Sequence, residues 1–189
     1  MKPFLKKSKG LLFVGAHVKV RHGYKITAGR NLILEDNVSL NALSEDGIIF
    51  GDDVSIARDS ILFCTGIIAH RGKGIVIGDR TGISARAYFA GQGGIIIGSE
   101  VIMGPNVQIF SENHAYADIN TPIKDQGVFK QPVVVGNNCW IGAGSTILAG
   151  VTIGDGCVVA AGSVVSKSFP ANSVIAGIPA KLIKTRGEN

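Results

Sequence analysis

Aliphatic residues recur every six positions along much of the chain, and small residues recur at the same interval between them. The longest run of aliphatic positions is Val135, Ile141, Ile147, Ile153, Val159 and Val165, accompanied by Cys139, Ser145, Val151, Cys157 and Ser163. Shorter runs with this spacing are Val14, Val20, Ile26; Phe50, Ile56, Leu62; Ile77, Ile83, Phe89; and Ile97, Met103, Ile109. A period of six fits neither an α-helix nor one continuous strand.

Such a period predicts short strands joined by tight turns. Three hexads would form a triangular coil of about 18 residues, with coils stacked at the strand spacing of roughly 4.8 Å. Each coil then covers the apolar face of its neighbour, and the repeated aliphatic residues point inward. The 26 glycines and the aromatic content of 6% agree with many short strands and close corners. We therefore predict an all-β parallel β-helix that spans residues 1–189 as one domain, with a cap or tail over 170–189.

The period is broken at three places. The interval from Ile109 to Val135 is 26 residues, so a loop of about 115–130 must leave the prism. Smaller interruptions lie between Leu62 and Ile77 and between Phe89 and Ile97. Long excursions from a compact scaffold are often functional, and His114 lies at the mouth of the longest one.

Charge and cysteine content narrow the class of protein. The net charge is +5, and much of the excess lies near the ends, in Lys2, Lys6, Lys7, Lys9, Lys19, Arg21, Lys25, Lys181, Lys184 and Arg186. These residues are either solvated ends or a site for an acidic ligand or a membrane surface. No nucleic-acid-binding pattern is present. Without an apolar run of membrane-spanning length or a secretory leader, we expect a cytoplasmic protein with free thiols, in at most peripheral contact with membranes.

The hexads and the loop motif together resemble a known family, the hexapeptide-repeat acyltransferases with a left-handed parallel β-helix. The motif reads Asn113-His114, Tyr116, Asp118, Pro122-Ile123 and Gln126-Gly127, and is similar to the branch of maltose, galactoside, streptogramin and surface-polysaccharide O-acetyltransferases. This resemblance implies a homotrimer with active sites between neighbouring chains. It also implies acetyl-CoA as co-substrate, no metal, and a carbohydrate acceptor, in bacterial surface-polysaccharide synthesis (lipopolysaccharide or capsule).

The resemblance also implies roles for individual residues. His114 would be the general base that deprotonates a sugar hydroxyl, which suits an imidazole at neutral pH. The backbone N–H of Ala143 would stabilise the oxyanion, so transfer would be direct, without an acyl-enzyme. Coenzyme A would meet Gly142, Ala143, Ala161, Ser166, Lys167, Lys181 and Lys184. The acceptor side would include Asn113, Trp140, Tyr88 and Asp118.

Other functions stay open on the sequence alone. A sugar N-acetyltransferase or an antibiotic O-acetyltransferase would carry the same pattern. A zinc enzyme similar to the gamma-class carbonic anhydrases needs three converging histidines, and here only His17 and His22 are suitably close in sequence. A non-enzymatic scaffold would leave the loop and the basic tail without a purpose.

Overall fold

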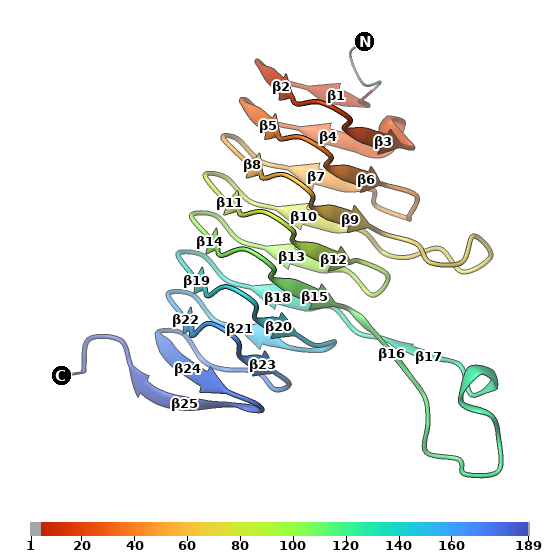
Figure 1. Ribbon diagram of the computed structural model, residues 1–189, viewed down its shortest axis with the longest axis vertical. Helices are drawn as coiled ribbons and strands as arrows, with labels where there is room; N and C mark the ends of the chain where they lie inside the picture. The colour runs from red at the N-terminus through yellow and green to blue at the C-terminus, as the bar shows by residue number, and fades with distance from the viewer. Residues whose placement is uncertain (1–4, 189) are drawn as a thin grey trace.

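The chain winds through three parallel β-sheets that form the sides of a prism (Figure 1). The computed structural model describes residues 5–188, so Lys2 and both ends of the predicted domain lie outside the described residues. The first sheet contains β1 (Lys7–Ser8), β4 (Ile26–Ala28), β7 (Ile48–Phe50), β10 (Ile75–Ile77), β13 (Ile95–Ile97), β18 (Val133–Val135) and β21 (Thr152–Ile153).

The second sheet contains β2 (Leu12–Val14), β5 (Leu32–Leu34), β8 (Ser55–Ile56), β11 (Gly82–Ile83), β14 (Ile102–Met103), β19 (Trp140–Ile141), β22 (Val158–Val159), β24 (Ser173–Gly177) and the antiparallel β25 (Ala180–Thr185). The third contains β3 (Lys19–Arg21), β6 (Ser39–Asn41), β9 (Ile61–Phe63), β12 (Tyr88–Ala90), β15 (Gln108–Phe110), β20 (Thr146–Ile147) and β23 (Val164–Val165). The left-handed parallel β-helix is thus confirmed. Within residues 5–188 the helices are the short 3-10 turns η1 (Gly23–Lys25) and η2 (Ile123–Asp125), and none could span a membrane.

The predicted inward residues form a continuous core. All six aliphatic positions of the longest run are at most 1% exposed, and Cys139 and Cys157 are buried among them. The spacing of 18 residues per coil holds over the last coils, where Val134 pairs with Thr152. The prediction is wrong for Val14, which is 43% exposed, because among the described residues no further coil covers β2 at that end.

Residues in excess of 18 per coil accumulate at one edge of the prism, between the third sheet and the first. The segment 64–74 lies between β9 and β10, and the segment 111–132 lies between β15 and β18. The other two edges keep turns of three or four residues from coil to coil, up to the last coil. We call the third-to-first edge the loop edge, and it is where the prism departs from its flat walls (Figure 1).

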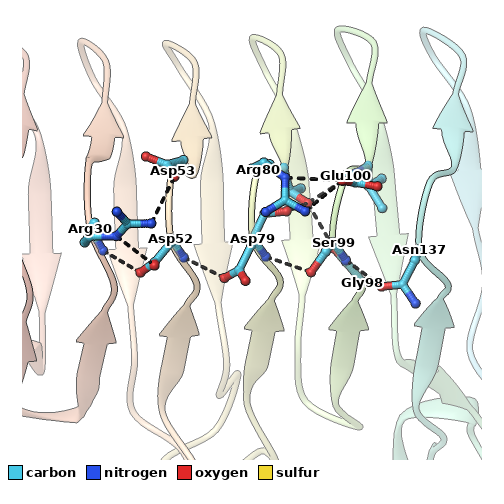
Figure 2. Close-up of polar contacts among 11 residues, drawn as sticks. Arg30, Asp52, Asp53, Asp79, Arg80, Gly98, Ser99, Glu100 and Asn137 are labelled. Carbon is cyan, nitrogen blue, oxygen red and sulfur yellow. Dashed lines mark hydrogen bonds and ion pairs between the residues drawn. The ribbon is translucent and has the colours of Figure 1, made fainter.

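The edge between the first and second sheets carries a ladder of hydrogen bonds (Figure 2). The backbone N–H of each corner residue donates to the side chain of its counterpart in the next coil. The donor and acceptor residues are Arg30 to Asp52 (2.8 Å), Asp52 to Asp79 (2.7 Å), Asp79 to Ser99 (3.0 Å), Ser99 to Asn137 (2.9 Å) and Asn137 to Asp155 (2.6 Å). A Cβ at Gly51 would lie 2.2 Å from the Asp79 carboxylate, so the ladder requires glycine there.

We expect an Asp52→Asn variant to be less stable than the wild type only at pH values where Asp52 is ionised. The Arg30 N–H and guanidinium donate to this carboxylate and lower the pKa of Asp52. Because its pKa is lower in the folded state than in the unfolded state, the Asp52 carboxylate stabilises the fold at pH values above its unfolded pKa of about 3.9. This stabilisation is lost as the pH falls through the folded-state pKa. Thermal melts from pH 6 downward should show the difference shrinking, whereas Asp125→Asn, outside the ladder, should show none. A constant difference across that range would contradict the assignment.

Candidate active site

A two-stranded antiparallel ribbon leaves the prism at the loop edge (Figure 1). It is formed by β16 (Glu112–His114) and β17 (Val128–Lys130), with His114 opposite Val128 and Glu112 opposite Lys130. The third-sheet strand β15 runs directly into β16, so the scaffold fixes the root of the ribbon. His114 is therefore held on a hydrogen-bonded strand at the base of the loop rather than at its tip.

Asp118 organises the far part of the ribbon. Its carboxylate accepts hydrogen bonds from the Thr121 hydroxyl at 2.7 Å and the Asn120 N–H at 2.9 Å, and these bonds lower the pKa of Asp118. The Gln126 amide donates to the carbonyls of Asp118 and Thr121, both at 2.7 Å. Asp118 lines the same groove as His114, and both of its carboxylate oxygens also bond within the loop, so its acceptor-side role stays a prediction.

His114 lines an open groove of about 1180 Å³ between the ribbon and the prism. Asn113, Phe129, Gln131 and Leu148 also line it. The His114 side chain is exposed, and His22 is the only histidine ring that has a hydrogen-bond partner among residues 5–188. No described residue therefore fixes the tautomer of His114, and its ring nitrogens are open to a hydrogen bond from a bound molecule.

Ala143 lies at a different edge, between the second and third sheets. Its N–H has no acceptor among the described residues, whereas its carbonyl accepts from Gly162 at 2.8 Å. A free N–H at a rigid corner is the kind of donor that an oxyanion requires. The neighbouring Gly142 is required for coil packing, because a Cβ there would lie 2.5 Å from the Ala161 nitrogen.

One chain does not bring His114 and Ala143 together. Thr146 pairs with Gln108 and Ile147 with Ile109 across the third sheet. Ala143 lies three residues before Thr146 on one strand, and His114 lies five residues after Ile109 on the paired strand. The two residues therefore lie at opposite ends of the third-sheet wall. The groove beside His114 includes Leu148 and excludes Ala143.

Two predicted acceptor-side residues lie away from the groove in their own chain. Tyr88 packs in a row of third-sheet aromatic rings, with centroids 5.4 Å from Phe63 and 5.8 Å from Phe110. Trp140 faces outward, as predicted, and is 57% exposed. It lies on the second sheet, which is the side of the prism opposite the loop edge, so its predicted acceptor-side role stays a prediction that would need the loop of a neighbouring chain.

The residues predicted to meet coenzyme A are also divided between edges. Gly142, Ala143 and Ala161 stack at the second-to-third edge, whereas Ser166 and Lys167 follow β23 at the loop edge. The Lys167 ammonium lies 5.6 Å from the centre of the Phe169 ring. On β25, Lys181 pairs with Ala176 and Lys184 with Val174, and both lysines are exposed. The short strand β23 (Val164–Val165) separates these two groups along one coil.

The cysteines are not placed as nucleophiles. Burial raises the pKa of the Cys64 thiol to about 12 and that of Cys139 to about 11. The Cys157 thiol donates to the Pro170 carbonyl inside the core. The histidines His17 and His22 lie at different edges of the prism, and residues 5–188 contain no cluster of three or more metal-ligating side chains.

Two features of the loop edge could not be described from the sequence. The first is the loop of residues 64–73, whose only signal was the 15-residue interval from Leu62 to Ile77. The second is Lys130, whose ammonium donates to the His70 and Arg71 carbonyls, each at 3.2 Å. No sequence pattern indicates this contact, because the partners are about sixty residues apart and the acceptors are backbone atoms.

A β-helix of hexapeptide repeats with a histidine on a projecting ribbon and a free corner N–H defines a class of acyl-transfer enzyme. The family model for bacterial transferase hexapeptides (six repeats) matches residues 132–167. A protein of Dictyostelium discoideum named as an acetyltransferase is 37% identical over 183 residues, which cover 95% of this chain and 92% of that protein. The chain therefore belongs to the hexapeptide-repeat acetyltransferases.

Two further similarities concern substrates. An Escherichia coli protein named for O-acetyl transfer in lipopolysaccharide biosynthesis is 33% identical over 121 residues, covering 60% of this chain and 62% of that protein. A hexapeptide-repeat acetyltransferase of Vibrio cholerae was solved with acetyl coenzyme A bound. It is 29% identical, with a TM-score of 0.64, over 73% of this chain and 70% of that one. The protein is an acyltransferase.

Proposed function

We propose that the protein transfers an acetyl group from acetyl-CoA to a carbohydrate hydroxyl, in the synthesis of a bacterial surface polysaccharide in the cytoplasm. The observation that carries the proposal is the pair formed by a free imidazole at His114 and a free corner N–H at Ala143. These are the base and the oxyanion donor that direct acyl transfer requires. The two relatives named for O-acetyl transfer and solved with acetyl coenzyme A support the choice of acceptor and donor.

The chain's own residues suit this donor. Lys181 and Lys184 give the last strand, β25, an exposed positive surface for the nucleotide phosphates, although each exposed contact contributes under about 1 kcal/mol. The stacked corners around Ala143 and Ala161 carry no bulky side chain. A thioester carbonyl could therefore approach the Ala143 N–H closely.

In the proposed reaction His114 accepts the proton of the acceptor hydroxyl as its oxygen attacks the thioester carbon. The new C–O bond forms and the carbonyl oxygen becomes an oxyanion beside the Ala143 N–H. When the C–S bond breaks, His114 returns the proton to the leaving thiolate, which gives coenzyme A thiol and an acetyl ester. Atoms and charge balance without a further reactant.

The separation of His114 from Ala143 within one chain supports a homotrimer in which each site uses two chains. A closed threefold ring presents the loop edge of one chain to the next chain at every interface. The same arrangement would bring the second-to-third edge, with Ala143 and the exposed Trp140 beside it, toward the partner's ribbon. Analytical ultracentrifugation should give the mass of a trimer.

The test is thiol release from acetyl-CoA with a panel of neutral sugars, amino sugars and glycosides as acceptors. We expect acceptor-dependent release and an alkali-labile acetyl ester. An alkali-stable amide on an amino sugar would assign N-acetyl transfer instead. Absence of both acetyl-CoA binding by calorimetry and thiol release would overturn the proposed function.

A further inference from the structure

The first coil of the prism carries basic residues and no acidic ones. This coil consists of β1, β2 and β3 with the turns around them, and we call it the basic end (Figure 1). The sequence has no aspartate or glutamate before Glu35. Five exposed cations of the basic end form no ion pair within residues 5–188, and they are Lys6, Lys7, Lys9, Lys19 and Arg21. The positive charge of this coil is therefore not compensated within the coil itself.

The acidic side chains of the next two coils bond within the prism. The Glu35 carboxylate accepts from the Arg58 N–H at 2.9 Å, and the Asp52 carboxylate accepts from the Arg30 guanidinium at 2.9 Å. Arg30, and to a smaller extent Lys9, lowers the pKa of Asp52. These carboxylates lie in later coils than the basic end, so a surface that approaches this end along the prism meets the cations first.

Apolar side chains are exposed on the same coil. Leu11 and Tyr24 are each 61% exposed, and Phe13 is 51% exposed. Val14 is 43% exposed although it occupies an inward position, because its partner Leu34 in the next coil is 1% exposed. The basic end therefore presents aliphatic and aromatic side chains among its unpaired cations.

This combination of side chains decides between three occupants of the surface. A second copy of the basic end would bring like charges together, and lysines on edge strands oppose pairing with another sheet. A nucleic acid would bind the cations, but its phosphates would not favour burial of Leu11 or Val14. An anionic bilayer satisfies both kinds of side chain, because its headgroups attract lysine and arginine while apolar side chains enter the interface.

Contact at the basic end would leave the groove beside His114 open. The third sheet begins with β3, and β15, which leads into the His114 ribbon, is its fifth strand. At the strand spacing, four steps place this strand about 19 Å from the first coil. The groove also includes Leu148, which lies one coil further along. A surface that covers the basic end therefore does not cover this groove.

We propose that the basic end docks on the surface of an anionic lipid bilayer. Its lysines and Arg21 contact the headgroups, and Leu11 and Phe13 enter the interface between headgroups and acyl chains. In the trimer proposed above, rotation about one axis places all three basic ends on the same face of the ring. Three linked contacts would strengthen the attachment beyond that of one chain. The inference concerns a surface remote from His114 and does not depend on acetyl transfer.

The first experiment measures sedimentation of the protein with phosphatidylcholine vesicles, with and without phosphatidylglycerol. We expect binding that requires phosphatidylglycerol and weakens with salt. Lys7→Gln/Lys19→Gln should lower the partition coefficient by at least about tenfold, because each basic residue at an anionic surface contributes roughly fivefold. Lys181→Gln/Lys184→Gln removes the same charge from β25, at the opposite end of the prism, and should bind as the wild type does.

Three results would overturn the inference. The first is that the wild type does not sediment with phosphatidylglycerol vesicles at low salt. The second is an equal loss in both lysine variants, which would show that binding follows the net charge and not the basic end. The third is tighter binding to a DNA duplex than to these vesicles at the same ionic strength, which would assign the basic end to a nucleic acid.

The second experiment tests the apolar contact. Phe13→Ser should lower the partition coefficient about tenfold at high salt, where the electrostatic part is screened, because burial of a phenylalanine side chain contributes at least roughly that factor. Ile102→Ser is the matched control, since Ile102 is exposed on the same sheet at 64%, four coils away. Equal partition of Phe13→Ser and the wild type, with both folded by circular dichroism, would overturn insertion at the basic end and the inference with it.

Discussion

Replacing His114 with alanine is expected to lower kcat for acetyl transfer by about 10²–10⁴-fold, the contribution of a positioned general base. Without the imidazole, the acceptor hydroxyl must lose its proton to water as it attacks. The side chain is exposed and makes no hydrogen bond within the described residues, so its removal should leave the fold and the binding of acetyl-CoA unchanged. Steady-state kinetics and calorimetry on the same preparation measure both effects.

His22→Ala is the matched control for this variant. His22 is another histidine at the loop edge and is hydrogen-bonded to Tyr24 at 3.3 Å. It follows β3, several coils before the ribbon that carries His114. It should keep wild-type kcat. Near wild-type turnover in His114→Ala would reject the general base, and a loss of equal size in both variants would indicate a general effect on the loop edge.

Replacing Ala143 with proline is expected to lower kcat by about 10²–10³-fold, the effect of deleting one oxyanion donor. Proline removes the N–H and nothing else that the site uses. The substitution suits the fold, because Pro105 already occupies the same corner position in the adjacent coil, where its carbonyl accepts from the Gly144 N–H at 2.8 Å. The affinity for acetyl-CoA should fall less than kcat.

Ala85→Pro provides the control for corner geometry. Ala85 occupies the same edge one coil before Pro105, and its carbonyl accepts from Asn106 at 2.9 Å. If both proline variants melt at the wild-type temperature and only Ala143→Pro loses turnover, the missing N–H is the cause. Full activity in a folded Ala143→Pro variant would place the oxyanion elsewhere.

The six-residue period predicted most of the fold, because a repeated inward aliphatic residue is a local signal that each coil repeats. It did not predict the polar ladder through Asp52, Asp79 and Asn137, since these bonds join residues that become neighbours only when coils stack. The breaks in the period were visible, but their common location was not. Each insertion falls after a third-sheet strand, and only the three-sided winding places them all on one edge.

Candidate site residues could be named from the sequence, but their arrangement in space could not. His114 was singled out because it stands where the repeat stops. Asp118 lines the His114 groove, but its hydrogen bonds to Thr121 and Asn120 lie inside the loop and cannot be derived from spacing. Trp140 was named for the acceptor side, but the side of the prism on which it lies depends on the winding of the chain.

The central claim is that each site combines His114 of one chain with Ala143 of another, and mixed oligomers test it most directly. His114→Ala and Ala143→Pro chains, each inactive alone, are unfolded together, refolded as mixed oligomers and assayed. In a random mixture about a quarter of the interfaces would join an intact His114 to an intact Ala143 in a closed ring, so we predict recovery of about a quarter of wild-type turnover. Recovery of none, in oligomers shown to be mixed, would contradict a site shared between chains.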